Sequence, residues 1–209
     1  MFCIQQNAYN RTMQIAVATQ NEHKLRELKA ILDGYTLLSP REAGVDFTYE
    51  ETGSTFLENS LGKALHLHRL TGLPSLADDS GLSVPSMDGE PGVRSARYGS
   101  DIAGRLLDSP ERNEYLLEKM KALEDRKAFF VCCITLVVAP YRQFSAQETL
   151  EGEITYEPRG SEGFGYDPLF FLPTMGCTVA ELSSGKKNEL SHRGKAATAL
   201  STMLAKVTF

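Results

Sequence analysis

The pattern of hydrophobic and polar positions divides the N-terminal part of the chain into a strand, a loop and a helix. Residues 13–19 form a short, nearly unbroken apolar run, which is typical of a strand buried on both faces. Apolar residues then recur at helical spacing over residues 21–32, where Asn21 is a good N-cap and Asp33-Gly34 stops the pattern. A second short strand is expected at residues 35–38.

The next helix is predicted by its first turn. Thr55 and Glu58 have the spacing of a capping box, and the helical pattern runs from there to about Leu70. Lys63 falls on the polar face of this helix, where it points either to water or to a nearby pocket. The expected inner face consists of Leu57, Leu61, Ala64 and Leu65.

Two adjacent acids follow an apolar run in residues 76–82, Leu-Ala-Asp-Asp-Ser-Gly-Leu. This pattern predicts a strand that delivers Asp78 and Asp79 to its end, with Ser80-Gly81 as a turn. Neighbouring side chains on a strand point to opposite faces, so the two acids enter one pocket only if the strand has already ended. Because buried carboxylates are costly without cations, hydrogen-bond donors or a metal, we expect a neutralising partner.

The second half of the chain alternates between regular segments and glycine-rich loops. A helix is predicted over residues 113–123, and strands over residues 128–139, 148–156 and 169–172. Between the last two strands, Gly163 and Gly165 flank Phe164. This loop either presents the ring to a flat ligand or places it in the core beneath a tight turn.

The last helix is expected to begin near Lys186 and to end near Val207. Its start carries the densest basic patch of the chain, which is either a solvated helix end or a phosphate site. A second candidate anion site is the loop and first helical turn around Lys24, because free backbone N–H groups favour an anion there. A plain N-cap with a solvated lysine is the alternative. The C-terminal patch comprises Lys186, Lys187, His192, Arg193 and Lys195.

Composition narrows the possible classes of protein. The 209 residues carry a formal net charge of −5, which argues against general affinity for nucleic acid. We expect no membrane partner, because no apolar stretch approaches the roughly 20 residues of a spanning helix. The four cysteines have neither zinc nor redox spacing, and residues 1–12 do not resemble a signal peptide, so free thiols and a cytoplasmic location are expected.

Taken together, six segments resemble the inosine/xanthosine triphosphate pyrophosphatase family. This resemblance implies an α/β fold with an elongated central mixed sheet flanked by helices, and two lobes that enclose a nucleotide cleft. It also implies a single two-lobed domain over residues 13–209 after an extension of residues 1–12, and a homodimer. The segments that carry it are residues 18–24, 50–59, 76–82, 91–98, 163–168 and 191–195.

The activity implied by the resemblance is Mg²⁺-dependent hydrolysis of non-standard purine nucleoside triphosphates (ITP, dITP and XTP) to the monophosphate and pyrophosphate, which sanitises the nucleotide pool. Asp79 becomes the proton acceptor, and Glu50 with Asp79 the Mg²⁺ ligands, although Glu51 competes with Glu50 for the main role. The supporting positions are Glu51, Asp78, Lys63 and Arg97. The substrate-binding positions are Thr19, Gln20, Asn21, Glu22, His23, Lys24, Ser80, Phe164, Gly165, Tyr166, Asp167, Lys187, His192 and Arg193.

Two departures from the family pattern stand near these positions. Gln20 replaces the glycine of many relatives and could narrow the loop against the phosphates, and Gly185-Lys186 replaces an acidic pair. Two other functions stay open: a pyrophosphatase for modified pyrimidine or other damaged nucleotides, and a regulatory module that binds nucleotide without chemistry. A nucleic-acid-binding protein is the least supported alternative.

Overall fold

A seven-stranded mixed sheet forms the centre of the protein in the computed structural model, which describes residues 13–205. The strand order is β2-β1-β3-β4-β5-β6-β7, in which β1 runs parallel to β2 and β3 and the later neighbours are antiparallel. The predicted α/β class is confirmed. The strands are β1 (Gln14–Val17), β2 (Thr36–Leu38), β3 (Ser75–Ser83), β4 (Lys127–Ala139), β5 (Arg142–Ile154), β6 (Phe170–Leu172) and β7 (Cys177–Thr178).

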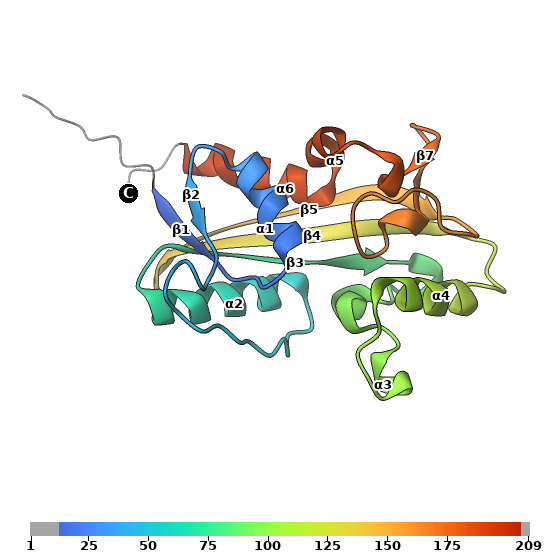
Figure 1. Ribbon diagram of the computed structural model, residues 1–209, viewed down its shortest axis with the longest axis horizontal. Helices are drawn as coiled ribbons and strands as arrows, with labels where there is room; N and C mark the ends of the chain where they lie inside the picture. Colours follow the sequence, from blue (N-terminus) through green and yellow to red (C-terminus); the bar gives the residue numbers. More distant parts are fainter. Residues whose placement is uncertain (1–12, 206–209) are drawn as a thin grey trace, which may run out of the picture.

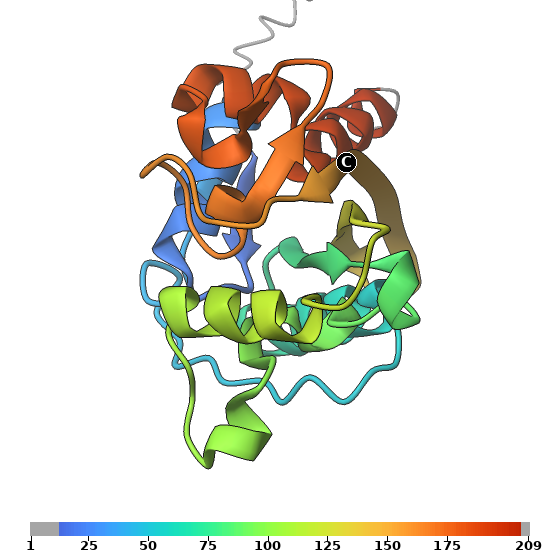
Figure 2. The same ribbon diagram turned by 90° about the vertical axis from the view of Figure 1, so that its right-hand side faces the viewer.

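Helices cover both faces of this sheet (Figures 1 and 2). α1, α5 and α6 lie on one face and α2, α3 and α4 on the other, while the long strands β3, β4 and β5 run along the molecule between its two ends. α6 packs on β4 and β5, and α2 packs on β3 and β4. The α-helices of the described residues are α1 (Glu22–Ile31), α2 (Phe56–Thr71), α3 (Ser100–Ala103), α4 (Ser109–Lys119), α5 (Ser184–Leu190) and α6 (His192–Leu204).

Strand β3 contributes to the core on both of its faces. Leu76 packs into the cluster beneath α1 and α6, whereas the next residue, Ala77, packs into the cluster beneath α2. The same alternation continues through the two acids that follow. β3 therefore carries one of these acids toward each helical layer.

The predicted end of this strand at the acids is wrong. β3 continues to Ser83, and Ser80 and Gly81 pair with Cys132 and Val131 of β4 rather than forming a turn. A Cβ on Gly81 would lie 2.5 Å from the carbonyl oxygen of Gly92, in the 3₁₀ helix η2 (Gly92–Arg97). The glycine thus permits close packing against the strand.

The two N-terminal helices begin as predicted, but the inner face of α2 differs. Asn21 caps α1, and Thr55 forms the capping box of α2. Leu57, expected to face inward, is 45% exposed, while Lys63 is buried. The buried stripe of α2 is largely polar because it faces Asp79 and Thr135, and hydrophobicity alone therefore assigns this face incorrectly.

The predicted single C-terminal helix is also wrong, because Ser191 divides it into α5 and α6. Ser191 has extended backbone angles (φ −66°, ψ 156°), and its side chain accepts a hydrogen bond from the backbone N–H of Gly194 at 3.0 Å. It therefore ends one helix and caps the next. The expected end near Val207 lies outside the described residues.

Two further boundaries differ from the prediction. α4 begins at Ser109 rather than at residue 113, because Asp108 and Glu111 form a capping box ahead of the hydrophobic pattern. β5 begins at Arg142, directly after the turn that joins it to β4, although its clear alternation starts later. Within residues 13–205, no helix combines the length and apolar character needed to cross a membrane.

Candidate active site

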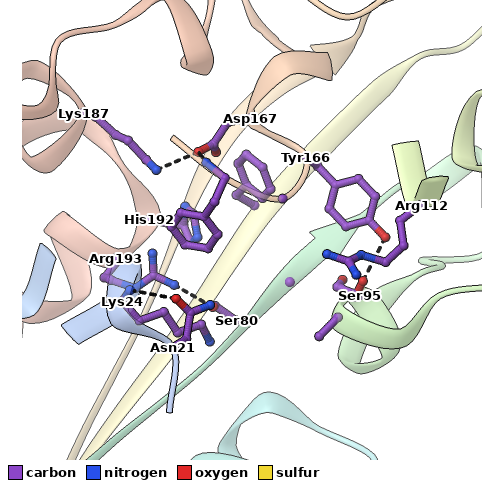
Figure 3. A pocket seen from close by; sticks show the side chains of 15 residues that line it. Asn21, Lys24, Ser80, Ser95, Arg112, Tyr166, Asp167, Lys187, His192 and Arg193 are labelled. Atoms are coloured by element: carbon purple, nitrogen blue, oxygen red, sulfur yellow. Dashed lines mark hydrogen bonds and ion pairs between the residues drawn. The ribbon is translucent and has the colours of Figure 1, made fainter. Parts of the chain in front are cut away.

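A pocket opens between the N-terminus of α1, the α5–α6 junction, the loop 163–167 and the segment from η2 to α4 (Figure 3). Of the substrate-binding positions expected from the sequence, the structure brings together Asn21, Lys24, Ser80, Phe164, Gly165, Tyr166, Asp167, Lys187, His192 and Arg193. Five further residues complete the lining: Gly81, Ser95, Ala96, Arg112 and Phe130.

Asp78 lies on the α6 face of β3, where it contacts three residues that line this pocket. Its fully buried carboxylate accepts hydrogen bonds from Arg193 Nε at 2.8 Å and from Lys24 Nζ at 2.5 Å. Ser80 Oγ and Cys132 Sγ also donate to it, at 3.1 and 2.9 Å. Burial raises the pKa of Asp78, but Arg193 and then Lys24 outweigh burial and hold the pKa well below its usual value. Asp78 is therefore a permanently ionised anchor for two cations.

Asp79 lies on the opposite face of β3, toward α2. Lys63 Nζ donates to Asp79 Oδ1 at 3.0 Å and to Glu51 Oε1 at 2.5 Å, and Asn59 Nδ2 lies 3.2 Å from Asp79 Oδ2. Arg97 adds a weaker contact to Glu51 at 3.4 Å. Burial raises the pKa of Asp79 to about 6; Lys63 works against this rise, and Glu51 adds to it. This carboxyl group therefore changes protonation close to neutral pH.

A second buried network positions the C-terminal cations. Lys187 Nζ contacts Asp167 Oδ2 at 2.7 Å and Glu27 Oε1 at 2.8 Å, and Arg193 Nη1 contacts Glu27 Oε2 at 2.6 Å. Phe164 lies beneath these cations, with its ring centroid 4.6 Å from Lys187 Nζ. The charges of α1, α5 and α6 are thus mutually compensated at the edge of the pocket.

His192 is buried between this network and the aromatic lining. Its ring stacks on Phe130 with centroids 4.8 Å apart, and its Nδ1 has no hydrogen-bond partner within the described residues. Burial, reinforced by the charge of Arg193, lowers the pKa of His192 well below its usual value. The imidazole is therefore neutral, and its Nδ1 is a buried polar atom that the described residues leave unsatisfied.

The remaining predicted substrate positions lie around the pocket. Thr19, Gln20 and Glu22 line a neighbouring groove, and His23 stacks on the outer side of Phe164 at 5.2 Å. The Nε2 of Gln20 donates to the carbonyl oxygen of Phe47 at 2.7 Å. This side chain therefore connects the loop to the segment that leads to Glu50 and Glu51, and its effect on the space for phosphates stays a prediction.

Of the two predicted metal ligands, the structure places Asp79 in the Lys63 cluster and leaves Glu50 exposed. No group of three or more ligand side chains converges within residues 13–205. Asp79 and Glu51 do form a pair of carboxylates that share one ammonium group. Mg²⁺ takes oxygen ligands and keeps several waters, so this pair has the donor chemistry for it, with Glu50 nearby in the sequence.

Several residues of the site were not predicted from the sequence. Glu27 follows Lys24 at helical spacing, so both lie on one face of α1, and this spacing could have revealed Glu27. In the same way, Asn59 shares one face of α2 with the predicted Lys63, and this spacing could have revealed Asn59. Cys132 and Arg112 carry no local signal, because only the folded chain brings them to the pocket.

Comparisons with known proteins agree with this architecture. The model of the Ham1 family matches residues 15–203. A dITP/XTP pyrophosphatase of Treponema denticola is 45% identical over 92% of this chain and 98% of its own length, and one of Thermus thermophilus is 49% identical over 91% of each chain.

Solved structures show the same fold. A HAM1 protein from Coxiella burnetii superposes with a TM-score of 0.85 at 41% identity, covering 94% of this chain and all of the other. The Ham1 protein of Staphylococcus aureus gives a TM-score of 0.82 at 38% identity, covering 92% and 98%. The family resemblance inferred from the sequence is confirmed: the chain belongs to the Ham1 family.

Proposed function

We propose that this protein hydrolyses non-standard purine nucleoside triphosphates, namely ITP, dITP and XTP, to the nucleoside monophosphate and pyrophosphate, with Mg²⁺ as cofactor. The observation that carries the proposal is the position of the two acids on β3. Asp78 anchors the cations of an aromatic-lined pocket, and Asp79, one residue further on, faces a second cluster of charged side chains on the other side of the strand. A nucleotide bound across this strand would place its base in the aromatic-lined pocket and extend its phosphates past Lys24 toward the cluster around Asp79.

Asp79 is suited to accept a proton from the attacking water. A general base works best when its pKa lies near the operating pH, and burial raises the pKa of Asp79 to about 6 before the charge of a bound Mg²⁺ ion, which lowers it, is added. Lys63 and Asn59 hold the two carboxylate oxygens separately, which fixes the orientation of the group. The water oxygen then bonds to the α-phosphorus, its proton passes to Asp79, and the bond to the bridging oxygen breaks as pyrophosphate leaves with the electron pair.

The phosphates need positive charge beyond that of the chain. Lys24 and Lys63 lie on either side of β3 next to the acids, where they would contact phosphate oxygens. Asp79 and Glu51, with Glu50, would hold the Mg²⁺ ion, which supplies charge stabilisation to the leaving pyrophosphate.

Base selection follows from the donors of the pocket. Hypoxanthine and xanthine carry an oxygen at the 6-position, where adenine carries an amino group. Arg193 is a pure donor, and the neutral His192 offers one ring N–H, so an adenine amino group would meet another donor at this edge. Phe164 could stack on the ring.

By resemblance to the family, we further propose that the protein is a homodimer and that it is cytoplasmic. Light scattering on the purified protein would test the dimer.

The decisive experiment measures pyrophosphate release from ITP, XTP, ATP, GTP and a modified pyrimidine triphosphate in the presence of Mg²⁺. We expect ITP and XTP to exceed ATP by about 100-fold in kcat/KM. The Asp79→Asn variant should lose at least about 100-fold in kcat while still binding nucleotide.

Asp101→Asn, which removes an exposed carboxylate outside the pocket, is the matched control and should keep wild-type rates. Full activity of Asp79→Asn would exclude this mechanism. A clear preference for the pyrimidine substrate would favour the damaged-pyrimidine alternative, and tight binding without pyrophosphate release would favour the regulatory module.

A further inference from the structure

Arg112 enters the pocket from α4, in the part of the molecule opposite α1 and α6 (Figure 3). Its guanidinium donates to the carbonyl oxygen of Leu107 at 2.5 Å and to Ser109 Oγ at 3.0 Å, so its own helix start holds it in place. A guanidinium has five N–H groups, and donors therefore remain for a ligand.

The charge of Arg112 is uncompensated, unlike that of the other cations in the pocket. Lys24 pairs with Asp78, Lys187 pairs with Asp167, and Arg193 pairs with Asp78 as well. Within residues 13–205, no carboxylate lies within ion-pair distance of Arg112, whose partners are neutral oxygens. The positive charge of Arg112 can therefore interact with a bound molecule.

The position of Arg112 assigns it to the base end of the proposed nucleotide site. Figure 3 shows Asn21 and Lys24 on one side of the pocket, and Arg112 with Ser95 and Tyr166 on the other. Because the proposed phosphate contacts lie on the side of Lys24, the base occupies the rest of the pocket, where it would reach from Arg193 and His192 toward Arg112. Aromatic rings line the interval between them, as a purine requires.

We propose that Arg112 is a specificity-determining residue that favours xanthine over the other purines. This inference rests on the proposed function and adds to it a selection among oxo-purines. Xanthine carries a second ring oxygen, at the 2-position, and its nucleosides lose a ring proton close to neutral pH, so the base is electron-rich and partly anionic. A guanidinium without a carboxylate partner, in a partly buried pocket, attracts that negative charge and stabilises the bound base.

The N–H donors of Arg112 disfavour binding of guanine and neither favour nor disfavour binding of hypoxanthine. Guanine carries an amino group at the 2-position, which would meet the guanidinium donor to donor, whereas hypoxanthine carries only hydrogen there. Arg112 therefore favours xanthine over hypoxanthine and helps to exclude the abundant guanine nucleotides.

The test compares kcat/KM for XTP and ITP in the Arg112→Gln, Arg112→Lys and Arg94→Gln variants. We expect the ratio of XTP to ITP to fall about tenfold in Arg112→Gln, the effect of losing one charge-assisted hydrogen bond. Arg112→Lys keeps the charge and should restore most of the ratio. Arg94→Gln removes an exposed cation of the same part of the molecule and should leave the ratio unchanged.

A binding measurement separates recognition from catalysis. Calorimetry with xanthosine and inosine monophosphates should show the same loss of preference in Arg112→Gln, and a thermal melt of each variant checks folding. An unchanged ratio in folded Arg112→Gln, or an equal loss in Arg94→Gln, would overturn the inference while leaving the proposed function intact. Inactivity of the wild-type protein on both triphosphates would instead refute the proposed function.

Discussion

At the scale of single residues, Asp78 and Asp79 show how one strand gives two identical side chains different chemistry. Arg193 and Lys24 keep Asp78 ionised despite its burial, whereas burial raises the pKa of Asp79 to about 6. Adjacent carboxyl groups whose pKa values are pushed apart are characteristic of acid–base sites. The anchor and the proposed base are therefore distinguished by their environments alone.

His192 gives a prediction about pH at this scale. Its pKa in the folded protein lies well below the unfolded value of 6.5, so the unfolded chain takes up this proton first as the pH falls. Its contribution to stability is present above pH 6.5 and is lost below it, by about 1.4 kcal/mol at pH 5.5.

Urea unfolding of the wild type and of His192→Gln at pH 7.5 and 5.5 measures this contribution. All other groups titrate in both proteins, so the difference between them isolates His192. The free energy of unfolding of the wild type should fall, relative to that of the variant, by about 1.4 kcal/mol between the two pH values. Parallel behaviour of the two proteins would show that His192 is not held neutral.

At the scale of elements, the short break at Ser191 shapes the C-terminal side of the pocket. In one uninterrupted helix, the basic residues would point in directions fixed by the helical repeat. The extended backbone at Ser191 instead turns the chain between α5 and α6, so that Lys187 and Arg193 both reach Glu27. The cations of two helices thus converge on one carboxylate.

Ser191→Ala tests this cap. Loss of the hydrogen bond to the backbone of Gly194 should lower the free energy of unfolding by about 1 kcal/mol. The loosened junction should also raise KM for ITP more than it lowers kcat, because the cations it orients bind substrate. Thr202→Ala, at the exposed end of α6, is the control and should change stability by less than about 0.5 kcal/mol.

The sequence predicted the elements better than their junctions. The capping residues Asn21 and Thr55 were identified because a cap acts through neighbours a few residues away. The break at Ser191 was missed because serine is tolerated within helices, and the extent of β3 was misjudged because Gly81 serves packing across the sheet. Local spacing contains no information on such distant contacts.

At the scale of the whole molecule, the site could be predicted where motifs carry it and not where tertiary packing creates it. Family motifs indicated most of the pocket-lining residues, including Lys24 and Arg193. Arg112 and Cys132 reach the site only because distant elements pack together, so no spacing in the sequence identifies them. The predicted metal-binding role of Glu50 stays a prediction.

Asp78 joins distant parts of the chain, and its removal should affect global stability. Its carboxylate holds Lys24 of α1, Cys132 of β4 and Arg193 of α6. Asp78→Asn leaves Lys24 without its carboxylate and leaves the buried Arg193 with Glu27 alone, and we expect a loss of about 3–5 kcal/mol in the free energy of unfolding.

Chemical denaturation followed by circular dichroism measures this loss. Asp101→Asn breaks an exposed ion pair with Arg94 and should cost less than about 1 kcal/mol. Similar small losses in both variants would mean that Asp78 does not connect these elements energetically.

The alternation of Asp78 and Asp79 across β3 also limits how this gene can change during evolution. Deletion or insertion of one residue early in the strand would turn every following side chain to the other face, placing Asp79 against α6. No single later substitution would restore the original faces of the side chains after such a shift in register. Length changes should therefore accumulate elsewhere, as in the exposed segment around Ile102 and Leu106, while β3 keeps a constant length in functional descendants.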